Sequence, residues 1–277
     1  MRKERSDDYL VQWKKVTRKK YFEELPFRTV FLSPFDMNLL YLAPSLRRDY
    51  IDSILEQKYE QFSGVKRQYD TVVRQRNALL KNVREGISKE SELDFWDKAF
   101  LDAAEYYMRY RERYFTYIKD HLHICKTYLG EYDVTLQVLT HEATETFDED
   151  IMRDYLLKNR GRDILTGHTH IGPHRDDFDI FVGHPDFGSG EAKHYLSRGE
   201  MKLLLLSLKL LEVNFLEERE DKTVILLIDD IFAELDEENI CRFLKTLTPY
   251  QTILTSQKPL PNGENWSEFT CINLKDS

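Results

Sequence analysis

The chain has 277 residues, which is long enough to bury a substantial core and to hold two domains. No window approaches the roughly 18 consecutive apolar residues of a membrane helix, and the first ten residues, MRKERSDDYL, are too charged for a secretory signal. The net charge of −9 argues against a broadly basic nucleic-acid surface and leaves room for a local one. The three cysteines, Cys125, Cys241 and Cys271, follow no metal-binding or redox spacing and are expected to be ordinary buried thiols of a cytoplasmic protein.

The first 32 residues are predicted to contain β structure. Residues 9–32 alternate between apolar and polar side chains, and Ser33-Pro34 ends the last strand because proline lacks an N–H donor. A sheet that starts at the first residue looks cut, so Met1 is expected to be an internal start or a fragment boundary. The basic cluster here is either the solvated face of a hairpin or a DNA contact. Its members are Lys14, Lys15, Arg18, Lys19 and Lys20.

Two long helices are predicted next, and together they suggest an antiparallel arm. The first runs from Pro44 to about Val83, and the second from a cap at Ser91 to about His121, with a polar turn between them. Arg76 interrupts the apolar stripe of the first helix. We interpret both stripes as packing surfaces. Their members are Phe62, Val65, Tyr69, Val72, Leu79 and Val83, then Trp96, Phe100, Ala103, Tyr107, Tyr114 and Ile118.

The middle of the chain predicts two strands around a helix. Tyr132–Leu139 and the alternating Phe178, Ile180 and Val182 indicate the strands, and Asp148–Arg160 indicates a helix that ends at Gly161. Three histidines lie between them: His168, His170 and His174. His-x-His spacing in a strand puts two imidazoles on one face, which would suit a metal. No cysteine or third-ligand pattern accompanies them, so a structural role is the alternative.

The stretch from Tyr195 to Asp236 organises the rest of the chain. Ser197 precedes a long leucine-rich helix and Glu200 follows three residues later, which is the spacing of a capping box. The N-terminus of such a helix attracts anions through its free N–H groups and dipole. Gly199 would let a phosphate approach the backbone. A charged turn, Glu218–Lys222, follows the helix.

A buried strand comes after that turn. Val224–Ile228 is an unbroken apolar run, which predicts burial on both faces, and it ends in Asp229 and Asp230. The aspartates either cap the strand or form a site for a metal and a general base. A helix at Glu237–Thr248 and a strand at Gln251–Thr255 are predicted next. A last strand is expected near Phe269–Leu274.

These segments resemble a known family. LSRGE with its helix is similar to the signature motif of ABC-type ATPase heads, VILLIDD to their Walker B strand and AELD to their D-loop. Four further segments resemble the RecF family: FLSPFDMNLL (Phe31–Leu40), SLRRDYID (Ser45–Asp52), RQRNALL (Arg74–Leu80) and GPHRDD (Gly172–Asp177).

The resemblance implies an α/β fold, an ABC-type ATPase head that is incomplete at its N-terminus and carries an inserted helical arm. Residues 1–40 would be a β segment of the head, 41–130 the arm, and 131–277 the C-terminal half of the head. The resemblance also implies roles for single residues. Asp229 would hold Mg²⁺, Asp230 would be the catalytic base, and Arg175 with Asp176 would hold a turn near the nucleotide. The ATP contacts would be Ser197, Arg198, Gly199, Glu200 and Asp236, while Thr255 and Ser256 stand where related heads sense the terminal phosphate.

One departure concerns ATP itself. None of the eleven glycines is followed by lysine, so the sequence contains no Gly-x-x-x-x-Gly-Lys-Ser/Thr loop. The nearest look-alike, Gly183 to Lys193, has the wrong spacing and an acidic residue inside it. We therefore expect this chain alone neither to bind ATP tightly nor to hydrolyse it.

The activity that the resemblance implies is ATP-dependent binding to single-stranded or gapped double-stranded DNA by an ATP-dependent homodimer. RecR and RecO would be partners in loading RecA during DNA repair, replication, recombination and the SOS response. One alternative is a non-enzymatic interaction or dimerisation protein with a degenerate head. Another SMC-like nuclease ATPase is disfavoured, because no acidic nuclease cluster follows the head and the arm is short.

Overall fold

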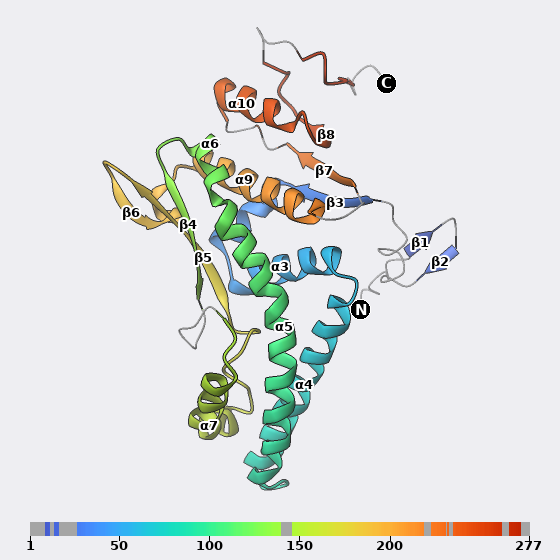
Figure 1. Ribbon diagram of the computed structural model, residues 1–277, viewed down its shortest axis with the longest axis vertical. Coiled ribbons are helices and arrows are strands. Elements are labelled where there is room, and N and C mark those ends of the chain that lie inside the picture. The colour runs from blue at the N-terminus through green and yellow to red at the C-terminus, as the bar shows by residue number, and fades with distance from the viewer. Residues whose placement is uncertain are drawn as a thin grey trace, which may run out of the picture.

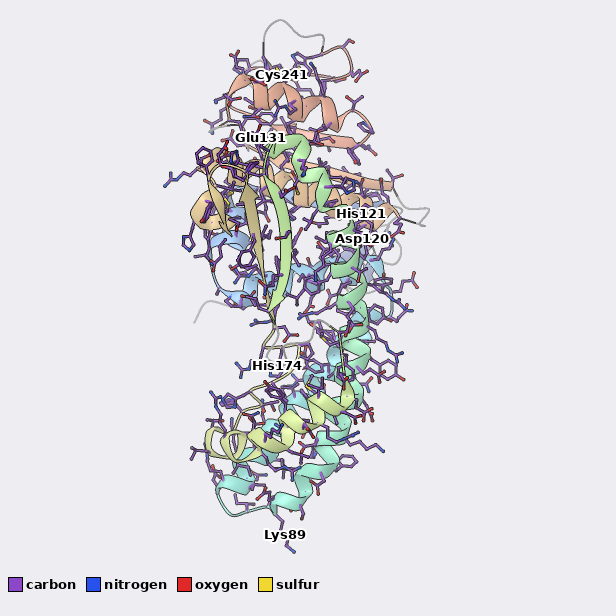
Figure 2. All side chains as sticks on the ribbon, turned by 60° about the vertical axis from the view of Figure 1, so that its left-hand side comes forward. Lys89, Asp120, His121, Glu131, His174 and Cys241 are labelled. Carbon is purple, nitrogen blue, oxygen red and sulfur yellow. The ribbon has the colours of Figure 1, made fainter. Side chains whose placement is uncertain are left out.

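The computed structural model describes residues 9–11, 14–16, 27–139, 146–218, 223–230, 232, 235–261 and 266–272. Figure 1 shows two sheets beside a central helix, with a long helical arm extending away from them. Lys89 lies at the far end of the arm, and Cys241 lies at the opposite end of the molecule (Figure 2). The expected mixed α/β architecture with an antiparallel arm is confirmed.

The central helix is α9 (Arg198–Glu217), which is buried on every side over most of its length. A helix that is apolar all round must lie inside a protein, and this one carries the leucine-rich run into the common core. Even the charged residues in its middle, Lys202, Lys209 and Glu212, are buried. Lys209 Nζ lies 3.1 Å from Glu212 Oε2, and the Tyr50 hydroxyl donates to the same oxygen at 2.7 Å, so the pair is neutralised and hydrogen-bonded, as burial of charge requires.

A parallel sheet packs against α9. Its strands are β3 (Phe27–Leu32), β7 (Thr223–Asp229) and β8 (Gln251–Thr255), with β7 in the middle. The predicted burial of both β7 faces is wrong for one of them. Val224, Leu226 and Ile228 are buried, whereas Ile225 and Leu227 between them are only half-buried, because just one face of the sheet joins the core that contains α9. Helix α10 (Glu237–Leu247) lies between β7 and β8 in sequence.

An antiparallel sheet forms the second layer. It consists of β4 (Asp133–Leu139), β5 (Asp177–His184) and β6 (Gly188–Glu191), followed by the short helix α8 (Ala192–Tyr195). The alternation predicted for β4 and β5 is confirmed. The phosphate-loop look-alike between Gly183 and Lys193 is the β5–β6 hairpin, so its glycines serve strand pairing.

The arm is built from α4 (Phe62–Arg84) and α5 (Leu93–His121), with α3 (Pro44–Lys58) at its base. The expected continuous helical pattern from Pro44 is broken by Tyr59, whose backbone is extended and whose ring packs edge-on against another aromatic ring. The predicted cap at Ser91 is wrong. Ser91 lies inside the 3-10 turn η2 (Glu90–Glu92), where the Glu92 side chain accepts from the Lys89 N–H at 2.8 Å.

Helix α7 (Glu149–Thr166) packs along α4 and α5. Its start is as predicted, because Asp148 caps the first turn by accepting from two backbone N–H groups at 3.0 Å. The predicted end at Gly161 is wrong. The helix runs on to Gly167, which adopts a left-handed φ of +70° and closes the last turn. Asp163, buried against the arm, holds the turn beyond Gly161 in place.

The remaining elements are short. They are η1 (Pro34–Met37), α2 (Asn38–Tyr41), η3 (Leu122–Cys125), α6 (Lys126–Leu129) and a hairpin of β1 (Tyr9–Val11) with β2 (Lys14–Val16). A hairpin is thus present, with Lys14 and Lys15 in β2, while Arg18, Lys19 and Lys20 lie outside the described residues.

The last described residues differ from expectation. Phe269–Ile272 form no strand, because the chain turns at Trp266, whose carbonyl accepts from the Phe269 N–H at 2.9 Å; Leu274 lies outside the described residues.

Of the three cysteines, only Cys125 is buried, and burial raises the pKa of its thiol to about 12. Cys241 is half-buried, and Cys271 is exposed on the irregular last segment, so the expectation of three buried thiols is wrong for these two. Among the helices described here, none has the length and apolarity to cross a membrane.

Candidate functional site

The first turn of α9 carries the predicted capping box. The Ser197 N–H donates to Glu200 Oε2 at 2.7 Å, and the Glu200 N–H donates to Ser197 Oγ at 3.3 Å. Ser197 and Arg198 are exposed, so the positive end of the helix dipole is open to solvent. This turn can therefore receive an anion, although the capping box by itself also serves the helix.

Asp229 is the last residue of β7 and is exposed. Its neighbour across the ladder is Thr255, whose hydroxyl donates to Asp229 Oδ1 at 2.6 Å. Within the described part of the chain, Oδ2 has no hydrogen-bond partner. An exposed carboxylate held at one oxygen leaves the other available to a hydrated cation.

Asp230 is held in an unusual backbone conformation. Its φ is +42°, the one positive value among the described non-glycine residues, and aspartate is one of the few residues that tolerate this region. Gln257 fixes the carboxylate from both sides, because its side-chain amide donates to Oδ2 at 2.7 Å and its backbone N–H donates to Oδ1 at 3.2 Å. The sequence prediction missed Gln257. Its only signal was its position two residues after Thr255.

Asp236, predicted to contact the nucleotide, caps α10. Asp236 Oδ1 accepts from the Asn239 N–H at 2.7 Å, and Oδ2 accepts from the Asn239 side chain at 2.9 Å. A structural role therefore accounts for both of its carboxylate oxygens. Ala233 and Glu234 of the same motif lie outside the described residues.

These residues come from elements that are directly linked. Helix α9 packs on β3 and β7, and only residues 218–222 separate its end from the start of β7. The helix and the strand therefore run in opposite directions, and the start of α9 lies toward the same end of the sheet as the end of β7 (Figure 1).

A second group of polar residues joins the head to the arm. Arg47 of α3 binds Asp177 of β5 through two parallel hydrogen bonds of 2.6 Å, and this contact raises the pKa of Arg47. Arg48 donates to the Asp176 carbonyl at 3.0 Å. The segments SLRRDYID and GPHRDD, which are remote in sequence, are therefore in direct contact, and bidentate pairing fixes their orientation.

Arg111 of α5 extends this junction into the core. Its Nη2 donates to Asp52 Oδ1 at 3.0 Å and its Nη1 to the Pro173 carbonyl at 2.8 Å, while the Tyr107 hydroxyl donates to Asp52 at 2.6 Å. All three side chains are buried. A buried charge requires such pairing, so this cluster binds α3, α5 and the loop before β5 together.

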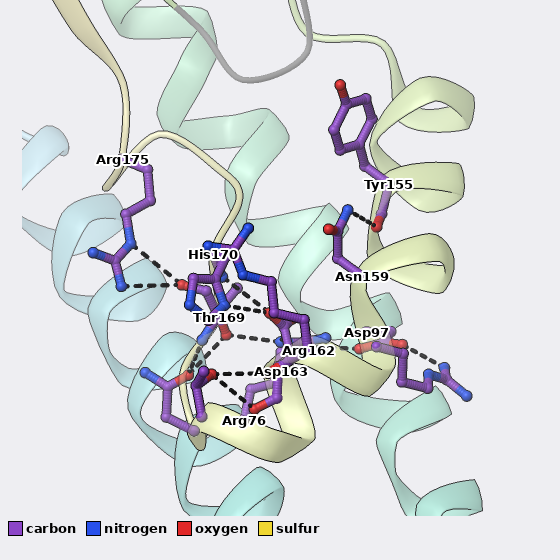
Figure 3. Close-up of polar contacts among 12 residues, drawn as sticks. Arg76, Asp97, Tyr155, Asn159, Arg162, Asp163, Thr169, His170 and Arg175 are labelled. Carbon is purple, nitrogen blue, oxygen red and sulfur yellow. Dashed lines mark hydrogen bonds and ion pairs between the residues drawn. The ribbon is translucent and has the colours of Figure 1, made fainter.

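Arg76 explains the break in the apolar stripe of α4. It is fully buried and binds three partners at 2.8 Å each: Asp97 of α5, Asp163 of α7 and the hydroxyl of Thr169 (Figure 3). The Asn77 side chain accepts from the Thr169 N–H at 2.7 Å. The RQRNALL segment thus fixes α5, α7 and the loop after α7 to a single helix.

The three histidines do not form a metal site. Residues 168–176 contain no strand, and His170 Nδ1 lies 2.8 Å from Asp163 Oδ1 while His174 Nδ1 lies 2.6 Å from the Tyr69 hydroxyl. Among the described residues, the group with metal-ligand spacing is Glu131, His184 and Asp186 instead. The structural interpretation of His168, His170 and His174 is therefore the one that their contacts support.

Arg175 and Asp176 hold the loop through separate partners. Arg175 donates to the Thr169 carbonyl at 3.3 Å, and Asp176 accepts from Arg48 through its backbone. Their turn lies at the arm junction, where Arg111 and Arg48 surround it. Burial raises the pKa of Asp176 to about 6, against the opposing effect of these arginines, and burial lowers the pKa of His174 to about 4.

No protein-family model matches the chain. The DNA replication and repair protein RecF of Thermoanaerobacter sp. (strain X514) is 30% identical over 234 residues, which cover 82% of this chain and 62% of that protein. The protein of the same description from Shewanella baltica (strain OS223) is 34% identical over 227 residues, covering 82% and 59%. The chain spans about three fifths of the length of these curated relatives.

A solved structure that resembles this chain is also a RecF protein. The recombination mediator protein RecF-ATPrS in the RecFOR pathway matches with a TM-score of 0.76 and 26% sequence identity, over 91% of this chain and 68% of that one. The two sheets with α9 are therefore an ABC-type ATPase head, and α3 to α5 belong to a helical arm inserted in it. The expected fold class is confirmed.

Proposed function

Since this chain is a homologue of the RecF proteins over 82% of its length, we propose that it is a RecF-like DNA replication and repair protein that contributes half of a composite ATP site. The observation that carries the proposal is an open helix N-terminus at Ser197 in a chain whose strand β7 ends in exposed Asp229 and half-buried Asp230. A relative with the same fold was solved with an ATP analogue, which supports nucleotide as the ligand.

The residues of this chain suit the binding of Mg²⁺ and of the terminal phosphate of ATP. The sequence contains no Gly-x-x-x-x-Gly-Lys-Ser/Thr loop that would surround the phosphates. Asp229, with one carboxylate oxygen available, would hold Mg²⁺, which when bound neutralises developing charge on the phosphates. Asp230 would orient the attacking water, and Gln257 positions the Asp230 carboxylate. Aspartate is one methylene shorter than the glutamate of most ABC-type heads, so turnover should be slow.

The turn at Ser197 would act on a second subunit. In a composite site, the Ser197 hydroxyl and the free N–H groups of Arg198 and Gly199 face the terminal phosphate held by the partner's loop, and Glu200 holds the turn in shape through its bond to the Ser197 N–H. ATP would then join two copies into a homodimer that closes on single-stranded or gapped DNA. RecR, RecO and RecA in the cytoplasm are the partners that this proposal implies for recombination and the SOS response.

The experiment compares nucleotide binding by two proteins in the presence of Mg²⁺. One is this 277-residue chain, and the other carries in addition, at its N-terminus, the P-loop segment of a RecF relative. A fluorescent ATP analogue should bind the extended protein and not the chain alone, and Asp229→Ala should weaken that binding.

Two outcomes contradict the proposal. Tight, Mg²⁺-dependent binding by the chain alone would show that a different phosphate site exists. Failure of a folded extended protein to bind would favour a non-enzymatic interaction protein with a degenerate head.

A further inference from the structure

The outward face of α4 carries a row of cations at seven-residue spacing. Arg67, Arg74 and Lys81 are all exposed. Seven residues make nearly two helical turns, so the three side chains leave the helix on one side, roughly 10 Å apart along its axis. We call these three residues the α4 basic row.

The three cations of the α4 basic row form no ion pair among the described residues. Arg74 donates to the Thr71 hydroxyl at 3.0 Å, and neither Arg67 nor Lys81 forms an ion pair there. By contrast, three surface arginines on other helices, two of them exposed and one half-buried, each bind a glutamate one turn earlier. They are Arg109 with Glu105, Arg153 with Glu149 and Arg242 with Glu238.

The neighbours of the row are suited to an anion. Gln68, Gln75 and Asn82 are exposed on the same helix and offer amide donors. The one acid of α4 is Asp70, whose pKa burial raises. Six lysines and arginines against one acid make α4 strongly basic in a chain of net charge −9. Such a segregated charge attracts a polyanion at long range.

The row stands on a rigid support, because the buried Arg76 on the inner side of α4 binds this helix to α5, α7 and the loop at Thr169. That loop adds charge beside the row. A side chain at Gly167 would come within 2.7 Å of the Lys81 stem, so the two are in contact. Exposed His168 follows Gly167, and exposed Arg175 donates to the Thr169 carbonyl beside α4 (Figure 3).

From this arrangement we propose that the α4 basic row is a binding surface for the phosphate backbone of DNA. The inference rests on the DNA-binding part of the proposed function and locates that contact on the arm. A duplex carries a phosphate about every 3.4 Å along each strand, so each of the three cations finds one without a particular sequence. Amide donors beside the cations add phosphate contacts that are likewise independent of sequence.

The test compares two triple variants of the full chain. The row variant is Arg67→Gln, Arg74→Gln and Lys81→Gln. The control is Arg109→Gln, Arg153→Gln and Arg242→Gln, which removes the same charge from surface sites that are already paired. A third protein, Arg67→Lys with Arg74→Lys, keeps the charge of the row. Circular dichroism melting establishes that each is folded, and fluorescence anisotropy on a labelled gapped duplex is measured at several salt concentrations.

The row variant should bind at least about tenfold more weakly at low salt. Its slope of log affinity against log salt should be shallower by about 2 to 3, since each lost phosphate contact removes about 0.9. The control and the lysine variant should keep the wild-type slope. A folded row variant with unchanged affinity and slope overturns the inference while DNA binding itself stands. If the wild-type chain binds no DNA at low salt, both the DNA-binding part of the proposed function and the inference about the α4 basic row fail.

Discussion

Arg76→Met tests whether the buried network holds α5, α7 and the loop at Thr169 to α4. Arg76 is fully buried, and so is Asp163, one of the two carboxylates it neutralises. Methionine keeps an unbranched stem of similar reach but removes all three hydrogen bonds. Breaking a buried ion pair by removing one partner costs roughly 3–5 kcal/mol, because the remaining charge stays buried and uncompensated. That is a large part of the 5–15 kcal/mol by which a typical protein is stable.

The structure sets where in this range the cost should fall. Asp97 keeps Arg160 at 2.5 Å, so it remains paired after the substitution. Asp163 keeps only His170, through its ring at 2.8 Å and its backbone N–H at 3.2 Å. The uncompensated charge is therefore mainly that of Asp163, and we expect about 3 kcal/mol rather than the sum for two carboxylates.

A double-mutant cycle with Asp163→Leu separates this explanation from simple loss of packing. Free energies of unfolding come from urea titrations followed by helical circular dichroism. The double variant should cost about 1–3 kcal/mol less than the sum of the single variants, because each single variant leaves a buried partner unpaired. Additive costs, or a cost below about 1 kcal/mol for Arg76→Met, would refute the reasoning.

Three further predictions concern single sites. Gly172 has a φ of +107° and a side chain there would lie 2.6 Å from the buried Phe100 ring, so Gly172→Ala should lower the free energy of unfolding by roughly 1–3 kcal/mol in a urea titration. Ser197→Ala removes a helix cap and should cost about 1 kcal/mol, which a lowered Tm would show and Ser197→Asp should restore. The pKa of Asp176 is raised from 3.8 to about 6, so the folded state loses the stability that this carboxyl contributes as the pH rises from about 4 to 6. The pKa of His174 is lowered from 6.5 to about 4, so the folded state loses the stability that this imidazole contributes as the pH falls through that range. The two effects oppose each other, so Asp176→Asn should make stability fall more steeply from pH 6.5 to 4, by up to about 3 kcal/mol; an unchanged pH profile would contradict the assignment.

The sequence alone determined the features that depend on neighbours along the chain. Ser197 and Glu200 are three residues apart, and a cap at that spacing needs nothing beyond its own helix turn. The alternation in Phe178, Ile180 and Val182 and the apolar stripe of α5 likewise follow from the geometry of a strand and a helix. The bounds of strand β8, Gln251–Thr255, were also predicted to the residue.

The tertiary structure decided the features that need a partner far away in sequence. Gly161 predicts a helix end locally, yet α7 continues because Asp163 meets Arg76, 87 residues away. In the sequence, Arg76 interrupts an apolar stripe, because its counter-charges Asp97 and Asp163 lie on other helices. A charged side chain can be buried only where such partners surround it, and the sequence alone does not show them. Gln257 and Asp230 meet at the ends of two strands, a contact that depends on strand order. Sequence periodicity records which face of an element is buried, and only the fold determines what that face meets.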